Sequence, residues 1–145
     1  MTDDWETFSR EMAGAAGSLP DLTVAGTSMA DWQWLLDRLH SGRWTVGYSE
    51  DGEFIPMPTS AAEIFTADRE ASRIAKVQID GLWLNCHFWT VEEIDFDIDP
   101  REVQDEAGFE TLLRFMAWLG DSLDKPVYLS HEGSAESVIL RYPPG

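Results

Sequence analysis

Apolar residues recur at three- and four-residue steps in three long stretches of the chain, a spacing that lines them along one side of a helix. The last stretch has the longest apolar stripe, which comprises Phe109, Leu112, Leu113, Met116, Leu119 and Leu123. A shorter helix is predicted after Ser60, because Ser60 and Glu63 have the spacing of a capping box. The predicted helices cover residues 2–17, 28–42, 60–65 and 105–123.

Elsewhere apolar and polar residues alternate, and this two-residue period predicts β-strands. The clearest example surrounds Asp80-Gly81, a dipeptide typical of two-residue hairpin turns. Such a turn pairs Ile79 with Leu82, Val77 with Leu84 and Ala75 with Cys86 on one face. It pairs Gln78 with Trp83, Lys76 with Asn85 and Ile74 with His87 on the other face. Further strands are predicted over residues 44–48, 54–55, 93–99, 127–130 and 137–142, and residues 18–27 are predicted to form a loop.

Hairpin connections between neighbouring strands indicate an antiparallel sheet, and the amphipathic helices need such a sheet to bury their apolar sides. The chain of 145 residues has the size of one domain. We therefore expect a single α+β domain over residues 1–145, a mainly antiparallel sheet of hairpins and meander covered by amphipathic helices.

The composition narrows the range of partners. The chain has 27 acidic and 10 basic residues, a formal net charge of −17, so nucleic acid and anionic membrane surfaces would repel it. A basic protein remains a possible partner. Cys86 is the single cysteine, which excludes an intrachain disulfide and a multi-cysteine zinc site. The sequence has no signal-like start and no long apolar run, so we expect a cytoplasmic protein. The sequence does not determine its oligomeric state.

Residues 92–110 hold nine acids and one base, which is nearly half of the net negative charge of the chain. Within them one predicted strand has Glu93, Asp95, Asp97 and Asp99 alternating with apolar residues. Alternate side chains of a strand project about 6.6–6.8 Å apart, close to the spacing of phosphates along a nucleic-acid strand. The acids can therefore dock a basic surface such as the groove of a nucleic-acid enzyme, or they can form a solvated face that only maintains solubility.

The same acids imitate the ligand spacing of an EF-hand calcium loop, but the imitation fails at the turn. Pro100 stands where that loop needs glycine, and a strand would send the acids outward in a line. We expect no metal and no other cofactor.

Catalytic motifs are absent from the sequence. Cys86 and His87 point to opposite faces of a strand, and Ser130-His131-Glu132 are neighbours in a turn rather than a triad assembled from separate segments. The chain has no phosphate-binding loop, metalloprotease helix motif or nucleophile elbow. We therefore expect no enzymatic activity. The polar and aromatic strand face with Trp83, Asn85, His87 and Trp89 is the place for a small-molecule site, unless a helix covers it.

Seven tryptophans are many for this length, and most are expected in the core. Trp118 lies beside the main stripe of the long helix, and Trp83 and Trp89 lie on the mixed strand face. These three indoles are candidates for partner contacts, because aromatic residues are enriched at protein interfaces.

One segment resembles known proteins. The helix end Phe115–Asp121, followed by the strand Lys125–Leu129, resembles the C-terminal part of small acidic immunity proteins that bacteria make against polymorphic or contact-delivered toxins. The resemblance implies binding to a cognate toxin and occlusion of its active site, and it transfers no catalytic residue. Under this hypothesis a basic toxin domain is steered by the acidic strand and anchored by the indoles, with the proposed contact residues Glu93, Asp95, Asp97, Asp99, Trp83, Trp89 and Trp118.

Two other hypotheses remain open. The first is a small-molecule-binding protein or enzyme that uses the face with Trp83, Asn85, His87 and Trp89. The second is an acidic adaptor or oligomeric subunit whose charge has no role in binding.

Overall fold

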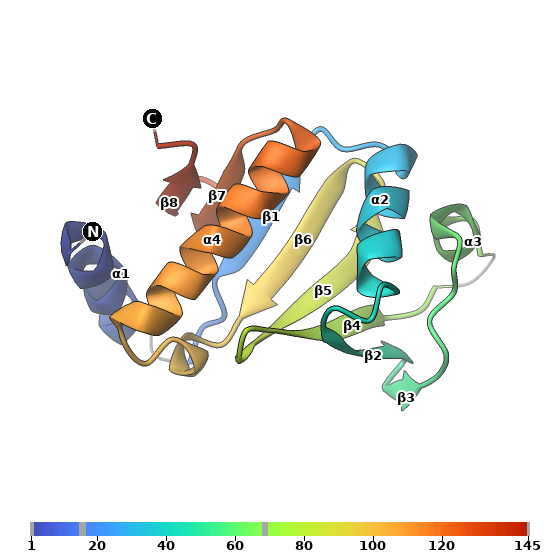
Figure 1. The fold of residues 1–145 in the computed structure, drawn as a ribbon, viewed down its shortest axis with the longest axis horizontal. Helices are drawn as coiled ribbons and strands as arrows, with labels where there is room; N and C mark the ends of the chain where they lie inside the picture. Colours follow the sequence, from blue (N-terminus) through green and yellow to red (C-terminus); the bar gives the residue numbers. More distant parts are fainter. Residues whose placement is uncertain (1, 15–16, 68–69, 145) are drawn as a thin grey trace.

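One antiparallel sheet organises the described part of the chain. The computed structural model describes residues 2–14, 17–67 and 70–144, and within them eight strands pair in the order β3-β2-β4-β5-β6-β1-β7-β8 (Figure 1). Their bounds are Asp21–Ala25 (β1), Thr45–Glu50 (β2), Glu53–Phe54 (β3), Arg73–Ile79 (β4), Leu82–Thr90 (β5), Glu93–Ile98 (β6), Val127–Ser130 (β7) and Val138–Tyr142 (β8). This arrangement with its helices confirms the predicted α+β class.

Three of the described helices begin directly after a capping residue. The helices of the described ranges are α1 (Thr2–Gly14), α2 (Met29–Leu39), α3 (Ala61–Phe65) and α4 (Glu106–Leu123), and a 3-10 turn η1 (Pro100–Glu102) lies between β6 and α4. The side chains of Ser28, Ser60 and Asp105 each accept a hydrogen bond from a backbone N–H of the first turn. These bonds satisfy donors that have no partner within the helix. The described first helix reaches Gly14, and residues 15–16, which precede the predicted stop at Gly17, lie outside the described residues.

The hairpin register is confirmed by the structure. Asp80 and Gly81 form the turn between β4 and β5, both with positive φ, as a type I′ turn requires. The ladder pairs Ile79 with Leu82, Val77 with Leu84 and Ala75 with Cys86, as predicted. The hairpins β2–β3 and β7–β8 also form at the predicted places.

The prediction of a loop over residues 18–27 is wrong, because Asp21–Ala25 forms strand β1. This strand pairs with β6 on one side and with β7 on the other, so it lies inside the sheet. The helix α4 leads from β6 to β7 and leaves a gap one strand wide between them, which β1 fills. The short alternating segment between Pro20 and Gly26 contains the signal of a strand, with Leu22 and Val24 buried.

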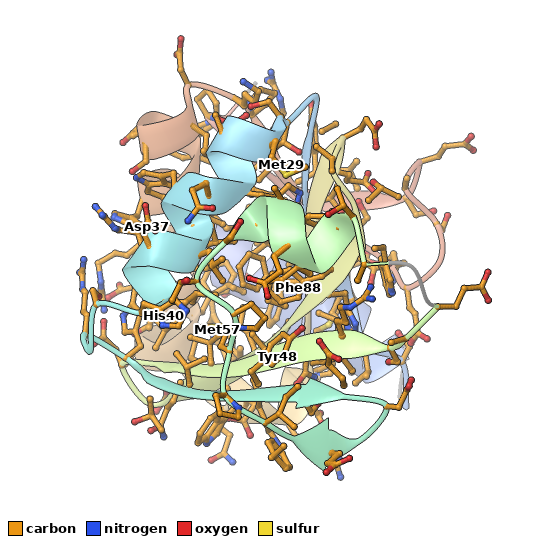
Figure 2. The ribbon with its side chains drawn as sticks, turned by 90° about the vertical axis from the view of Figure 1, so that its right-hand side faces the viewer. Met29, Asp37, His40, Tyr48, Met57 and Phe88 are labelled. Carbon is orange, nitrogen blue, oxygen red and sulfur yellow. The ribbon has the colours of Figure 1, made fainter. Side chains whose placement is uncertain are left out.

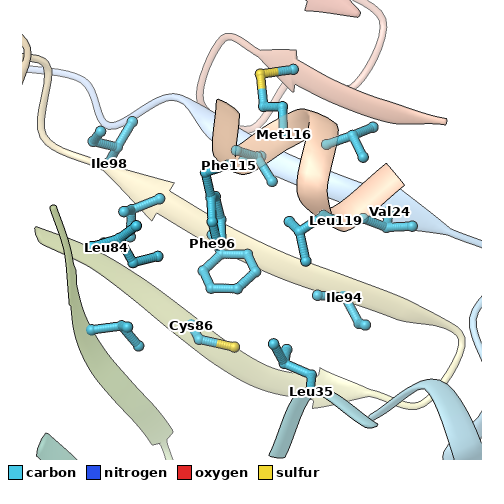
Figure 3. Packing of buried hydrophobic residues seen from close by; sticks show 14 of the residues in the cluster. Val24, Leu35, Leu84, Cys86, Ile94, Phe96, Ile98, Phe115, Met116 and Leu119 are labelled. Atoms are coloured by element: carbon cyan, nitrogen blue, oxygen red, sulfur yellow. The ribbon is translucent and has the colours of Figure 1, made fainter. Parts of the chain in front are cut away.

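The core lies between the sheet and the helices α2, α3 and α4. Phe96 of β6 stands under Phe115 of α4, with the ring centroids 5.2 Å apart (Figure 3). On the other side of the core, the ring centroid of Phe88 in β5 lies 5.0 Å from that of Trp32 in α2 and 5.8 Å from that of Tyr48 in β2. Figure 2 shows Phe88 and Tyr48 beneath α3. A single apolar layer therefore runs across the sheet beneath the helices.

The helix α1 extends this layer by packing on α4. Phe8 lies with its ring 5.1 Å from that of Phe109, and Trp5 lies 5.8 Å from the same ring. The described helices thus gather on one side of the sheet (Figure 1). The opposite side carries the alternate residues of every strand and receives no helix within the described ranges.

Replacement of Leu22 by alanine tests the place of β1. Leu22 has an exposed fraction of 0%, so Leu22→Ala is expected to lower the free energy of unfolding by about 2–5 kcal/mol through lost apolar burial and a residual cavity. Urea unfolding monitored by tryptophan fluorescence measures the change. Val138→Ala is the control, since Val138 is 47% exposed and its truncation should cost less than about 0.5 kcal/mol. Equally small costs at both positions would contradict an interior strand at 21–25.

Candidate functional site

The helix-free side of the sheet, called here the open face, collects most of the residues predicted to bind a partner. Strand residues two apart share a face, and the pairing aligns β5, β6 and β1 across its centre. The central residues of the open face are Trp83, Asn85, His87 and Trp89 from β5, Glu93, Asp95 and Asp97 from β6, and Asp21 and Thr23 from β1.

Asp97 is tied to two side chains of the neighbouring strand. Its Oδ1 accepts a hydrogen bond of 2.9 Å from Asn85 Nδ2, and its Oδ2 lies 2.5 Å from His87 Nε2. Asn85 lies directly opposite Asp97 in the ladder, whereas His87 reaches it diagonally. These contacts hold the carboxylate and the imidazole in fixed positions on the open face.

Asp95 has fewer partners although it is the more deeply buried acid, with 5% of the residue exposed. Its Oδ1 accepts a hydrogen bond of 3.3 Å from Thr23 Oγ1, and its Oδ2 receives no hydrogen bond from a described residue. Burial, followed by the charge of Glu93 and a hydrogen bond with that carboxylate, raises the pKa of Asp95 to about 7. At neutral pH Asp95 therefore retains its proton for part of the time.

Asp21 adds a third carboxyl group from β1, directly opposite Asp97. Its Oδ2 accepts a hydrogen bond of 3.1 Å from the backbone N–H of Gly133. Burial raises the pKa of Asp21 more than this bond lowers it, and the charge of Asp97 raises it further. The centre of the open face is thus a patch of closely spaced acids.

Aromatic side chains flank the acids along β5. Trp89 is 61% exposed, and its ring stacks on His87 with the centroids 4.4 Å apart and the planes 16° from parallel. Trp83 is half-buried, and the ammonium group of Lys76 lies 5.7 Å from its ring centroid. The predicted binding residues Trp83, Trp89, Glu93, Asp95 and Asp97 therefore share one face, although Asp95 is buried rather than displayed to solvent.

Two predicted residues lie elsewhere. Asp99 caps the 3-10 turn η1, where Arg101 donates to its carboxylate through both the backbone and the guanidinium group. These hydrogen bonds lower the pKa of Asp99. Both residues line a cavity of about 380 Å³ that also touches α1.

Trp118 lies on α4, in the helical layer. Its ring centroid is 4.9 Å from that of Trp34, 5.1 Å from Trp44 and 5.8 Å from Phe115, and it is half-buried. It therefore belongs to a different surface from the open face.

The sequence-based prediction of the binding face does not include two of its residues. Asp21 and Thr23 fall in the segment predicted to be a loop, so their approach to β6 was not foreseen. The alternation of Asp21, Leu22, Thr23 and Val24 contained the necessary signal, which predicts a strand with both polar side chains on one face.

The chemistry of the open face favours the binding of a cation. Cys86 lies on the helix-covered side, buried with a raised pKa, so it offers no nucleophile to this face. The described ranges contain no group of three or more His, Cys, Asp or Glu side chains arranged to hold a metal ion. Carboxylates beside an exposed indole instead provide hydrogen-bond acceptors and an aromatic surface for an organic cation.

Comparison of the chain with protein-family models, with curated proteins and with solved structures finds no match. Among the described residues, no helix combines the length and the apolar character needed to cross a membrane.

The raised pKa of Asp95 gives a test in pH-dependent stability. The folded protein retains the proton of Asp95 up to about pH 7, whereas the unfolded chain loses it near pH 4, so this group's contribution to stability falls as the pH rises between these values. Asp95→Asn removes the ionisation while keeping an acceptor for Thr23. The free energy of unfolding of Asp95→Asn minus that of the wild type is expected to increase from pH 4 to pH 7, by about 1.4 kcal/mol for each unit of pKa shift.

Urea unfolding at successive pH values measures this difference. Glu110→Gln serves as the control, because Glu110 is an exposed acid on α4. Its free energy of unfolding should follow the pH profile of the wild type. A wild type and an Asp95→Asn variant with parallel pH profiles would show that Asp95 does not titrate as the structure indicates.

Proposed function

We propose that the chain is a non-enzymatic binding protein that docks a basic protein on the open face. One observation carries the proposal: within the described chain the sheet is covered by helices on one side, while the other side presents an exposed indole beside several acids. Edge and face residues that serve only solubility are expected to be dispersed and fully solvated. Here Asp95 is buried and Asp97 is held in place by its neighbours, as in a preorganised binding surface.

Charge supports a basic partner. The chain carries a formal net charge of −17, and the acids of β1 and β6 lie together at the centre of the open face. A surface of this sign accelerates the approach of a positively charged protein and orients it. Trp89 supplies the apolar contact that holds the partner after encounter, because exposed indoles at the centre of an interface contribute strongly to affinity.

The proposed partner is a toxin domain. The resemblance of Phe115–Asp121 and Lys125–Leu129 to immunity proteins supports this identity, and those segments form the end of α4 and strand β7 in the structure. In this mechanism the open face covers the basic active-site groove of the toxin and prevents its substrate from entering.

The double variant Trp89→Ala/Glu93→Gln tests the docking face. The tagged chain is used to capture proteins from the lysate of its native organism, and a captured basic protein is identified, expressed and purified. We expect the double variant to bind that protein at least about tenfold more weakly, since it loses a central aromatic contact and one charge. The wild-type association rate, followed by stopped-flow fluorescence, should fall about tenfold or more between low and high salt.

The matched control is Glu110→Gln, which removes the same charge from an exposed position on the helical side. It should bind the partner within about twofold of the wild type. Co-expression then decides the toxin assignment, because the partner alone should arrest growth and the chain should restore it. An unchanged affinity of the double variant, or a partner that is harmless to cells, would contradict this function.

A further inference from the structure

The acids of the open face differ in how well their charges are satisfied. Asp97 accepts hydrogen bonds from Asn85 and His87, and Asp21 accepts one from the backbone of Gly133. Asp95 is only 5% exposed, and its Oδ2 receives no hydrogen bond from a described residue. Its hydrogen-bond neighbour is the carboxyl group of Glu93, which when ionised can only accept. A buried, ionised carboxyl oxygen without a donor is costly, so a donor supplied by a ligand would stabilise the ionised form of Asp95.

The pairing of β5 with β6 brings Trp89 to this position. His87 lies opposite Asp95, the register then shifts, and pairing resumes with Thr90 opposite Glu93. Trp89 therefore opposes the part of β6 between the two acids, on the face to which His87 also points. Its ring is stacked on His87 and is still 61% exposed.

The cations of the open face are engaged elsewhere. Lys76 lies over Trp83 at 5.7 Å, and Arg141 lies over Tyr128 at 5.8 Å. Lys76 belongs to β4 and Arg141 to β8, strands that do not adjoin β6. Neither of these residues forms a salt bridge with Glu93 or Asp95 among the described residues, so neither supplies a counter-charge to these two acids.

We propose that Trp89, Glu93 and Asp95 form a binding site for the guanidinium group of an arginine side chain. This inference rests on the proposed docking of a basic protein and names the group of that protein that the open face recognises. A guanidinium ion is planar and stacks on an indole, and its several N–H groups satisfy two carboxylates at once. A lysine ammonium lacks both the plane and the fork of donors, so the site discriminates between the two.

The neighbouring charges set the pH dependence of the site. Asp95 faces Glu93 and Asp97 on its own strand, His87 on β5 and Asp21 on β1. The proton that raises stability at low pH occupies the same carboxyl group that the guanidinium needs. Arginine binding therefore displaces this proton and strengthens as the pH rises from about 6 to about 8.

Peptide titration of the isolated chain tests the site. The probes are acetyl-Gly-Arg-Gly-amide and its lysine counterpart, added to nitrogen-15-labelled protein while the indole N–H signals are followed by NMR. The Trp89 signal is assigned by its loss in Trp89→Phe. We expect the arginine peptide to shift this signal and to bind at least about threefold more tightly than the lysine peptide. Its affinity should also be several-fold higher at pH 8 than at pH 6.

Variants separate this site from general attraction to an acidic protein. Glu93→Gln and Trp89→Leu should each lower the affinity for the arginine peptide about fivefold. Glu110→Gln should leave that affinity within about twofold of the wild-type value. Backbone amide spectra verify that each variant is folded. Equal binding of the two peptides, or an arginine peptide that shifts other signals but not that of Trp89, would overturn the inference.

The peptide result is separable from the result with the protein partner. If the arginine peptide does not bind at Trp89 while the double variant Trp89→Ala/Glu93→Gln still loses the protein partner, only the guanidinium site is overturned. If the peptide binds as expected but the identified basic protein binds all variants equally, the guanidinium site is supported and the docking function is overturned.

Discussion

The structure depends on the insertion of β1 between β6 and β7. Without it, the backbone N–H and C=O groups along one edge of each of these strands would have no partner beneath α4, and unpaired edges inside a domain are costly. The segment Asp21–Ala25 closes this gap and joins the β2–β6 part of the sheet to the terminal β7–β8 hairpin. It also places Leu22 and Val24 in the core and Asp21 and Thr23 on the opposite side. One short strand therefore completes both the apolar layer and the polar cluster.

The division of the sheet into a covered and an open face follows from the alternation along each strand. In β5, Leu84, Cys86 and Phe88 enter the core, so Asn85 and His87 between them must face the other way. On that face β1 sets Asp21 opposite Asp97, an unfavourable pairing of like charges. Hydrogen bonds from Asn85, His87 and Gly133 offset the repulsion. The polar network thus stabilises the register that the apolar layer requires.

Local patterns were sufficient to predict most elements. The Asp80-Gly81 turn and its pairs, the helix starts at Ser28, Ser60 and Asp105, and the stripe of α4 all depend on residues close in sequence. The place of β1 depends on strands about 70 and 100 residues further along, and its flanking Pro20 and Gly26 favoured a loop. For the same reason the burial of Asp95 was not predictable, since it requires Thr23 on one side and His87 on the other. The pattern of β6 identifies which acids share a face, whereas the neighbouring strands decide which of them is exposed.

Asp95 connects the stability of the fold to its proposed use. A carboxyl group in the middle of a sheet, with its pKa raised to about 7, is partly ionised at neutral pH and then lowers the stability of the folded state. An apolar residue of similar volume would avoid that cost, because replacement of buried charges by well-packed apolar groups is often neutral or stabilising. A bound cation removes the cost in another way, by compensating the charge in a place that folding has already freed from most of its water. Folding has therefore already removed part of the water that normally opposes ion pairing at an interface. In the proposed complex this unfavourable contribution to folding would become a favourable contribution to binding.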